Sequence, residues 1–286
     1  MAAASVYNSA PDSFMPTVEN APWAANYFPM ADGGIASRYK DAVPELMAHY
    51  TPLNMDVDGS KLSKSETLQK IKAMSQDEID ALSPTEKYDI LRGDYEFLTT
   101  HWELENRGPK RKPEPEGWEG FCNAMRAAGL IVPEPVNAIQ KKSKDGITVI
   151  LAPADVKALI GATFFYVEKY AAIATPHQGP GLDSDAPNPG AFHIAMNHLA
   201  LSGEFPIVID IENKGSQLWN EAVVGYERSM SEPKSLTAAE KSANPGATKK
   251  VRVDFTMKAL AEVDLEETDG ATKHRVAAGE LGINEI

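Results

Sequence analysis

Residues 117–125 read Gly117-Trp-Glu-Gly-Phe-Cys122-Asn-Ala-Met125 and contain the one cysteine of this 286-residue chain. A charged, proline-rich stretch precedes them and a run with helical spacing follows, so we expect Cys122 in the first turn of a helix. The free N–H groups at a helix start carry partial positive charge, which favours a thiolate. Cys122 is therefore a candidate nucleophile. The alternative is a buried structural thiol, since free cysteine is among the most buried residue types.

Composition narrows the classes of protein to consider. The net charge of -13 argues against nucleic acid and anionic membranes as partners, because both require a basic surface. No apolar run approaches the roughly 20 residues that a membrane-spanning helix needs. A single cysteine excludes an internal disulfide framework and a cysteine-rich metal site. Met1–Phe14 has no basic start and no apolar stretch, so the chain is expected to be cytoplasmic or to have lost a leader.

Pattern changes along the chain predict three regions. Residues 1–34 are rich in Ala, Pro and Asn without a period and predict an irregular N-terminal arm, anchored by Trp23 and Tyr27-Phe28. Residues 35–100 have helical spacing and predict a helical region. Residues 101–286 are expected to form the core that carries Cys122.

Several elements can be placed within these regions. Helices are expected at Tyr39–Tyr50 and Thr67–Met74, and two more are expected to begin at Ser75 and Ser83, each with an acidic residue three positions later. The Cys122 helix should end near Gly129. A further helix is expected at Pro153–Ala172, and strands at Ile147–Leu151 and Lys250–Lys258.

Two further runs read as neighbouring strands and carry ionisable groups. Phe192–Leu199 contains His193, and Phe205–Ile211 contains Asp210. A lone Asp among Val and Ile is costly to bury unless it is paired, so we expect Asp210 to orient His193 and His193 to deprotonate Cys122. The order Cys, His, Asp is typical of papain-like and transglutaminase-like triads. The alternative is a solvent-facing pair on an amphipathic hairpin, and His198 is a rival base on the opposite strand face.

A candidate calcium loop lies between two predicted helices. The segment Asn54-Met-Asp56-Val-Asp58-Gly begins like an EF-hand loop, with Glu66 as the closing acid. Leu62 and Glu66 each fall one position later than in that pattern. The predicted ligands are Asn54, Asp56, Asp58 and Glu66.

Five segments, in order, are similar to those of the transglutaminase elicitor family of oomycete plant pathogens, which has relatives in marine bacteria. They are Leu82–Asp89, Gly117–Asn123, Asn188–His193, Ile207–Asp210 and Leu218–Tyr226. The last resembles the peptide that the oomycete enzymes present as an immune pattern, V-W-N-Q-P-V-R-G-F. Here Ala222 stands where the peptide has Pro and Val224 where it has Arg. Because of these two differences, the resemblance does not predict elicitor activity.

This resemblance implies an α+β fold with a papain-like core and antiparallel sheet. It also implies a secreted, calcium-dependent protein-glutamine gamma-glutamyltransferase in which Cys122, His193 and Asp210 form the triad. The oomycete members carry extra cysteines that this chain lacks. The expected partners are proteins with accessible Gln and Lys, and the expected state is a monomer. Two alternatives stay open at this point: a papain-like cysteine protease or amidase, and an inactive recognition protein on the same fold.

Overall fold

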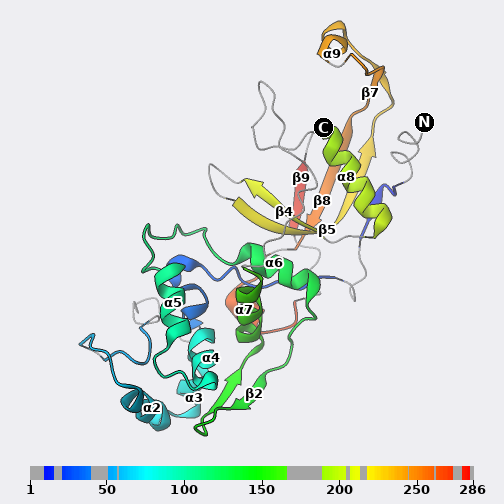
Figure 1. Cartoon of the computed structure of the whole chain (residues 1–286). Coiled ribbons are helices and arrows are strands. Elements are labelled where there is room, and N and C mark those ends of the chain that lie inside the picture. The colour runs from blue at the N-terminus through cyan, green and yellow to red at the C-terminus, as the bar shows by residue number, and fades with distance from the viewer. Residues whose placement is uncertain are drawn as a thin grey trace.

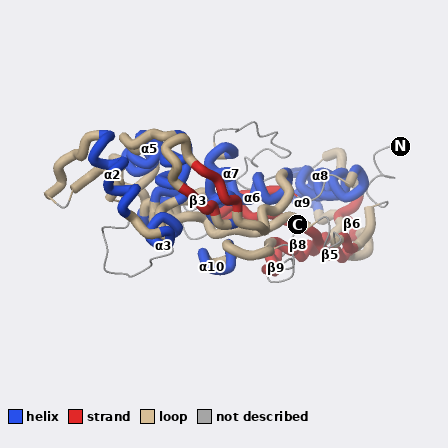
Figure 2. Tube along the Cα trace, turned by 90° about the horizontal axis from the view of Figure 1, so that it is seen from below, coloured by secondary structure: helices blue, strands red, loops and turns tan. Residues whose placement is uncertain are grey.

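The computed structural model describes residues 10–15, 21–39, 51–56, 58–165, 189–203, 207–212, 218–243, 245–260, 262–272 and 279–283. Most helices of the first half gather at one end of the molecule and the long strands at the other, with helices α6 and α7 between them (Figure 1). A view from below gives the same separation (Figure 2). The protein thus has a mixed α+β fold in which every strand pairing within the described residues is antiparallel.

The helical end begins with four helices, α2 (Lys64–Ala73), α3 (Gln76–Asp80), α4 (Pro84–Arg92) and α5 (Leu98–Asn106). Capping boxes at Ser75 and Ser83 start α3 and α4, so these two predictions are confirmed. Each serine hydroxyl accepts a hydrogen bond from the backbone N–H of the glutamate at the third helical position. The carboxylate of that glutamate accepts one from the serine N–H in return. The helix expected at Tyr39–Tyr50 lies, beyond Tyr39, outside the described residues.

The helices share their core with a hairpin that comes later in the chain. Strand β2 (Ile139–Lys142) pairs with β3 (Thr148–Leu151), which confirms most of the strand expected at 147–151. Ile147 and Val149 belong to the same buried cluster as Ile71 and Ile90 of the helices. The helical region therefore extends past the boundary expected at residue 100, a position that falls inside α5.

Helices α6 (Cys122–Ile131) and α7 (Pro153–Phe164) pack against residues 21–36. The backbone of this segment is irregular up to the short 3-10 helices η2 (Met30–Asp32) and η3 (Gly34–Ala36). Its side chains are nonetheless core: Trp23 and Phe28 are almost fully buried. From residue 21 the irregular N-terminal arm therefore docks on the core, with Trp23 and Phe28 as anchors, as the sequence predicted.

Gly129 marks the point where that segment crosses α6. The backbone N–H of Trp23 donates to the Gly129 carbonyl, and a Cβ on Gly129 would lie 2.3 Å from the Trp23 carbonyl oxygen. Gly129 therefore permits a close backbone approach. It does not end the helix as the sequence suggested, since α6 continues to Ile131.

The sheet end is built around the long strand β5 (Leu218–Met230). On one edge β5 pairs with β8 (Val253–Ala259), which pairs in turn with β9 (Gly279–Ile283). On the other edge β5 pairs first with β4 (Ile207–Glu212) and then with β1 (Ser13–Phe14). Alternate residues of β8 are buried, which confirms the half-exposed strand expected there.

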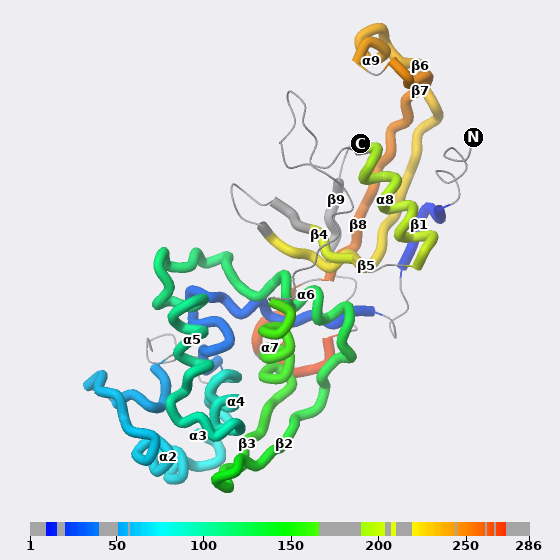
Figure 3. The backbone as a smooth tube through the Cα atoms, in the orientation of Figure 1, coloured from blue at the N-terminus to red at the C-terminus, as the bar shows by residue number. Residues whose placement is uncertain are grey.

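Smaller elements complete the chain. A hairpin of β6 (Lys234–Ser235) and β7 (Lys249–Lys250), with α9 (Ala238–Ala243) between them, projects from the sheet end (Figure 3). Helix α10 (Leu265–Thr268) lies near α7. Among the described residues, no helix combines the length and apolarity required to cross a bilayer.

Residues Pro189–Ser202 form helix α8, so the strand expected at Phe192–Leu199 is wrong. A short apolar run fits either period, and here the helical one holds: Phe192, Met196 and Leu199 face one buried cluster while Ile194 and Leu201 are exposed. Proline at the first position and several Ala and Leu residues favour the helix. The strand partner of β4 is therefore β5, and not the run at 192–199 that the sequence predicted.

Candidate active site

Cys122 is the first residue of α6 and borders a pocket of about 350 Å³. Its side chain is buried, with 8% of the residue exposed. The pocket is lined by residues from four parts of the chain: Met30, Asn106, Arg107, Arg111, Trp118, Glu119, Gly120, Cys122, Asn123, Phe165 and Asn220. The thiol therefore lies at the boundary between the core and an open depression, as a reactive cysteine requires.

Among the described residues, Asn220 of β5 forms a side-chain hydrogen bond to the sulfur of Cys122. Its amide Nδ2 donates to Cys122 Sγ over 3.4 Å. The backbone register places Asp210 of β4 directly opposite Asn220. Sequence reasoning missed Asn220. The available signal was its place in the Leu218–Tyr226 segment, which resembles a surface peptide and was therefore not predicted to contribute to the site.

Tyr27 clamps the loop that leads into α6. Its carbonyl accepts from the Phe121 N–H at 2.5 Å and its hydroxyl donates to the Gly117 carbonyl at 3.1 Å. A Cβ on Gly120 would lie 2.4 Å from Cδ2 of the Tyr27 ring, so only glycine fits. Burial raises the pKa of Tyr27 and the nearby Glu262 carboxylate raises it further, which keeps the hydroxyl protonated as a donor.

The pocket wall contains two arginines, each paired with a carboxylate. Arg107 Nη1 lies 3.0 Å from Glu103 Oε1, and its guanidinium stacks 4.1 Å from the Phe165 ring centre. Arg111 and Glu119 form a two-pronged pair with both distances at 2.7 Å. Burial raises the pKa of Glu103 to about 7, although Arg107 opposes that rise. Arg111 is therefore neutralised by Glu119, whose pKa it lowers, whereas Glu103 offsets the charge of Arg107 only in part near pH 7.

Arg126 lies one helical turn after Cys122 and holds the strand that carries Asn220. Its Nε donates to the Asn220 carbonyl over 3.3 Å, and its Nη2 lies 3.5 Å from Glu221 Oε2. The guanidinium is almost fully buried. Helix α6 thus contacts Asn220 at both the side chain and the main chain.

His193 lies elsewhere, on the side of α8 that packs against the sheet. Its ring packs edge-on against Phe255, with 5.7 Å between ring centres, and Asn197 one turn later accepts from Arg228. Burial lowers the pKa of His193 and the Arg228 charge lowers it further, so the imidazole is neutral at pH 7. His198, the rival base, is exposed on the same helix.

The sheet lies between His193 and Cys122. Val223 and Tyr226 of β5 pack with α8, whereas Ala222 and Val224 pack with Ala24 on the other face. Asn220 is two residues from Ala222, so both side chains lie on the same face of β5, which is the face that Cys122 contacts. Arg228 is eight residues from Asn220 along β5, which is roughly 26 Å at strand spacing. The structure brings Asp210 and Cys122 to the same end of the sheet but does not bring His193 to them.

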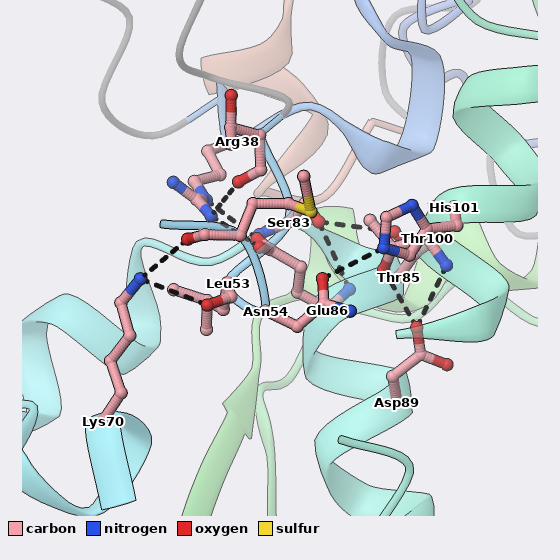
Figure 4. Close-up of polar contacts among 12 residues, drawn as sticks. Arg38, Leu53, Asn54, Lys70, Ser83, Thr85, Glu86, Asp89, Thr100 and His101 are labelled. Carbon is pink, nitrogen blue, oxygen red and sulfur yellow. Dashed lines mark hydrogen bonds and ion pairs between the residues drawn. The ribbon is translucent and has the colours of Figure 1, made fainter. Parts of the chain in front are cut away.

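The expected calcium ligands do not converge. Asn54 is buried, and its Nδ2 donates to the Glu96 carbonyl. Its Oδ1 lies 3.0 Å from His101 Nε2 (Figure 4). Glu66 closes the capping box of α2, and Asp58 accepts from the Ser60 N–H.

The remaining groups of this loop are also engaged. Lys70 Nζ donates to the carbonyls of Leu53 and Met55, so an ammonium group occupies two oxygens of the loop (Figure 4). Over the described ranges, no three His, Cys, Asp or Glu side chains gather as metal ligands would. Asn54, Asp58 and Glu66 are therefore engaged within the fold and do not form a preassembled cation site.

The fold and site define a mixed α+β protein whose buried cysteine starts a helix and lines a pocket. A model of the transglutaminase elicitor family matches residues 7–266, and the chain belongs to this family. Its structure is similar to the crystal structure of the GP42 transglutaminase from Phytophthora sojae, with a TM-score of 0.58 over 98% of this chain and 78% of that chain. Sequence identity to that protein is 15%, so this likeness concerns the fold alone. No curated protein matches the sequence.

Proposed function

We propose that this protein is a protein-glutamine gamma-glutamyltransferase, with Cys122 as the nucleophile. The observation that carries the proposal is the position of Cys122, at a helix start, in a pocket, with an amide donor on its sulfur. Membership of the transglutaminase elicitor family supports the same reaction class. The substrates are proteins with accessible glutamine and lysine side chains.

The reaction takes two steps. The Cys122 thiolate attacks the carboxamide carbon of a glutamine, a C–S bond forms, and the C–N bond breaks as ammonia leaves with a proton from the general acid. A lysine amine then attacks the thioester, a C–N bond forms, and the C–S bond breaks to restore the thiolate. The general base takes the proton of the entering amine. Water in place of the amine would give glutamate.

The family resemblance assigns the acid–base role to His193 and its orientation to Asp210. For Asp210, the register opposite Asn220 supports this assignment. For His193, the assignment requires that α8 deliver the imidazole to the Cys122 side of the sheet during turnover. Mutation of His193 therefore tests its role separately from the role of Cys122.

The test is incorporation of a fluorescent primary amine into casein, with Cys122→Ala as the matched inactive variant. We expect incorporation by the wild type and none above background by Cys122→Ala, while both unfold at the same temperature. Casein cleavage without incorporation would instead identify a protease. Absence of both reactions, with Cys122 unreactive to iodoacetamide at mildly acidic pH, would identify a recognition protein.

Calcium and chelator arms belong in the same assay. The family resemblance implies calcium dependence, and no cluster of metal-ligating side chains is preassembled at Asn54, Asp56, Asp58 and Glu66 in the described structure. If a chelator abolishes incorporation, Asp56→Asn and Asp58→Asn should leave the calcium requirement unchanged.

A further inference from the structure

Asn220 is the one side chain on β5 that the described structure bonds to the nucleophile. The 3.4 Å contact runs from its Nδ2 to Cys122 Sγ, and the residue also lines the pocket. Its backbone is fixed independently, because Arg126 donates to its carbonyl. Both contacts come from α6, so the amide group and the sulfur are held by one rigid helix.

The start of α6 supplies a second donor at the same place. The N–H groups of the first helical residues have no acceptor within their own helix. Asn123 Oδ1 accepts from the Ala124 N–H at 2.7 Å, which turns this side chain back on its own helix. Asn220 is the side-chain amide that the described structure bonds to Sγ itself, so it is already placed to donate to a substrate oxygen next to the sulfur.

We propose that Asn220 is a catalytic residue that completes the oxyanion hole of the Cys122 site. This inference rests on the proposed acyl transfer. In the resting enzyme its amide donates to the sulfur. When Sγ bonds to the carboxamide carbon, the C=O electron pair moves to oxygen, and the amide of Asn220 and the Cys122 N–H donate to that oxyanion. Collapse restores C=O as ammonia leaves, and the same donors serve the second tetrahedral intermediate.

The test compares Asn220→Ala and Asn220→Asp with the wild type for amine incorporation. Loss of an oxyanion donor typically costs about 10²–10³ in turnover. We therefore expect kcat to fall by roughly 100-fold or more in both variants, with KM changed by less than about threefold. The Asp variant keeps the shape of the side chain but lacks the donor, so it covers the case in which Asn220→Ala does not fold.

Alkylation of Cys122 separates this role from a structural one. Iodoacetamide reacts with the sulfur without forming an oxyanion, so Asn220→Ala should slow alkylation at mildly acidic pH by less than tenfold. Asn137→Ala is the matched control, because this exposed asparagine does not line the pocket, and it should leave turnover unchanged. A turnover loss below tenfold for Asn220→Ala, or an alkylation loss as large as the turnover loss, would overturn the proposal.

Failure of the parent proposal gives a different pattern. If wild-type protein incorporates no amine, ammonia release and peptide cleavage provide the turnover readout, because each passes through an oxyanion. If the wild type catalyses none of these, the role of Asn220 is overturned together with the parent proposal. An active wild type with an equally active Asn220→Ala variant overturns the role of Asn220 alone.

Discussion

On one face of β5, Asn220 reaches Cys122 at the start of α6, and on the other, Arg228 lies beside His193 of α8. The first face opens on a pocket and its polar groups surround a nucleophile. The second face is closed by an apolar cluster that includes Met196 and Phe255. A strand places neighbouring side chains on opposite faces, so the order of Cys, His and Asp along a chain does not determine which of them meet.

The largest expected effect comes from His193→Ala. If α8 supplies the acid–base group, amine incorporation should fall by roughly 10²–10⁴, the usual contribution of general acid–base catalysis. His198→Ala, on the exposed side of the same helix, should change activity by less than about twofold. An active His193→Ala variant would remove this residue from the site and leave the two faces functionally separate.

Gly129→Ala probes the packing on the Cys122 face. In a helix this change ordinarily stabilises by up to about 1 kcal/mol. Here the new Cβ would meet the Trp23 carbonyl oxygen at 2.3 Å, so we expect a loss of roughly 1–3 kcal/mol in the free energy of unfolding.

Denaturant titration of Gly129→Ala measures this loss. Gly117→Ala is the control, because nothing lies within 4 Å of a Cβ added there. Equal stability of both variants would mean that residues 21–30 do not cross α6 as described.

Arg126→Lys tests whether α6 positions Asn220 through its main chain. Lysine keeps a positive charge near Glu221 but loses the Nε donor to the Asn220 carbonyl. Small displacements of catalytic groups are costly, so kcat should fall roughly tenfold with KM little changed. Arg252→Lys, at an exposed pair with Asp254, should leave kcat as it is. A change confined to KM would assign Arg126 to substrate binding instead.

The smallest effect concerns pH on the α8 face. The pKa of His193 is lowered in the folded state by burial and then by Arg228, so the folded protein binds fewer protons there than the unfolded chain. Its contribution is present above the unfolded pKa of about 6.5 and is lost as pH falls below that value. The difference in unfolding temperature between wild type and His193→Gln should shrink from pH 7.5 to pH 5.5. A difference that stays constant with pH would contradict the buried, neutral imidazole.

The sequence predicted best what local chemistry controls. The capping boxes at Ser75 and Ser83, the Cys122 helix and the alternating strand near Val253 all depend on neighbouring residues, and all are present. The strand predicted at 192–199 was wrong because these eight residues fit both the helical and the strand period. Packing against β5 and β8 determines which of the two forms.

Long-range contacts escaped prediction for a different reason. Asn220 reaches Cys122 across 98 residues of sequence, and no local pattern encodes that distance. The Asn54 loop failed in the opposite way: its composition fits a cation, but Asn54 is engaged by Glu96 and His101, more than forty residues away.

The segment that supports Cys122 depends on the far end of the chain. The N–H groups of Ala24 and Asn26 donate to the hydroxyls of Thr272 and Thr268, and Asn26 in turn accepts from the Phe28 N–H. During synthesis, residues 268–272 leave the ribosome last among these groups. The support of the segment that carries Tyr27 is therefore completed only after residues 268–272 have been synthesised, so a chain that stops before them lacks the full support of its nucleophile.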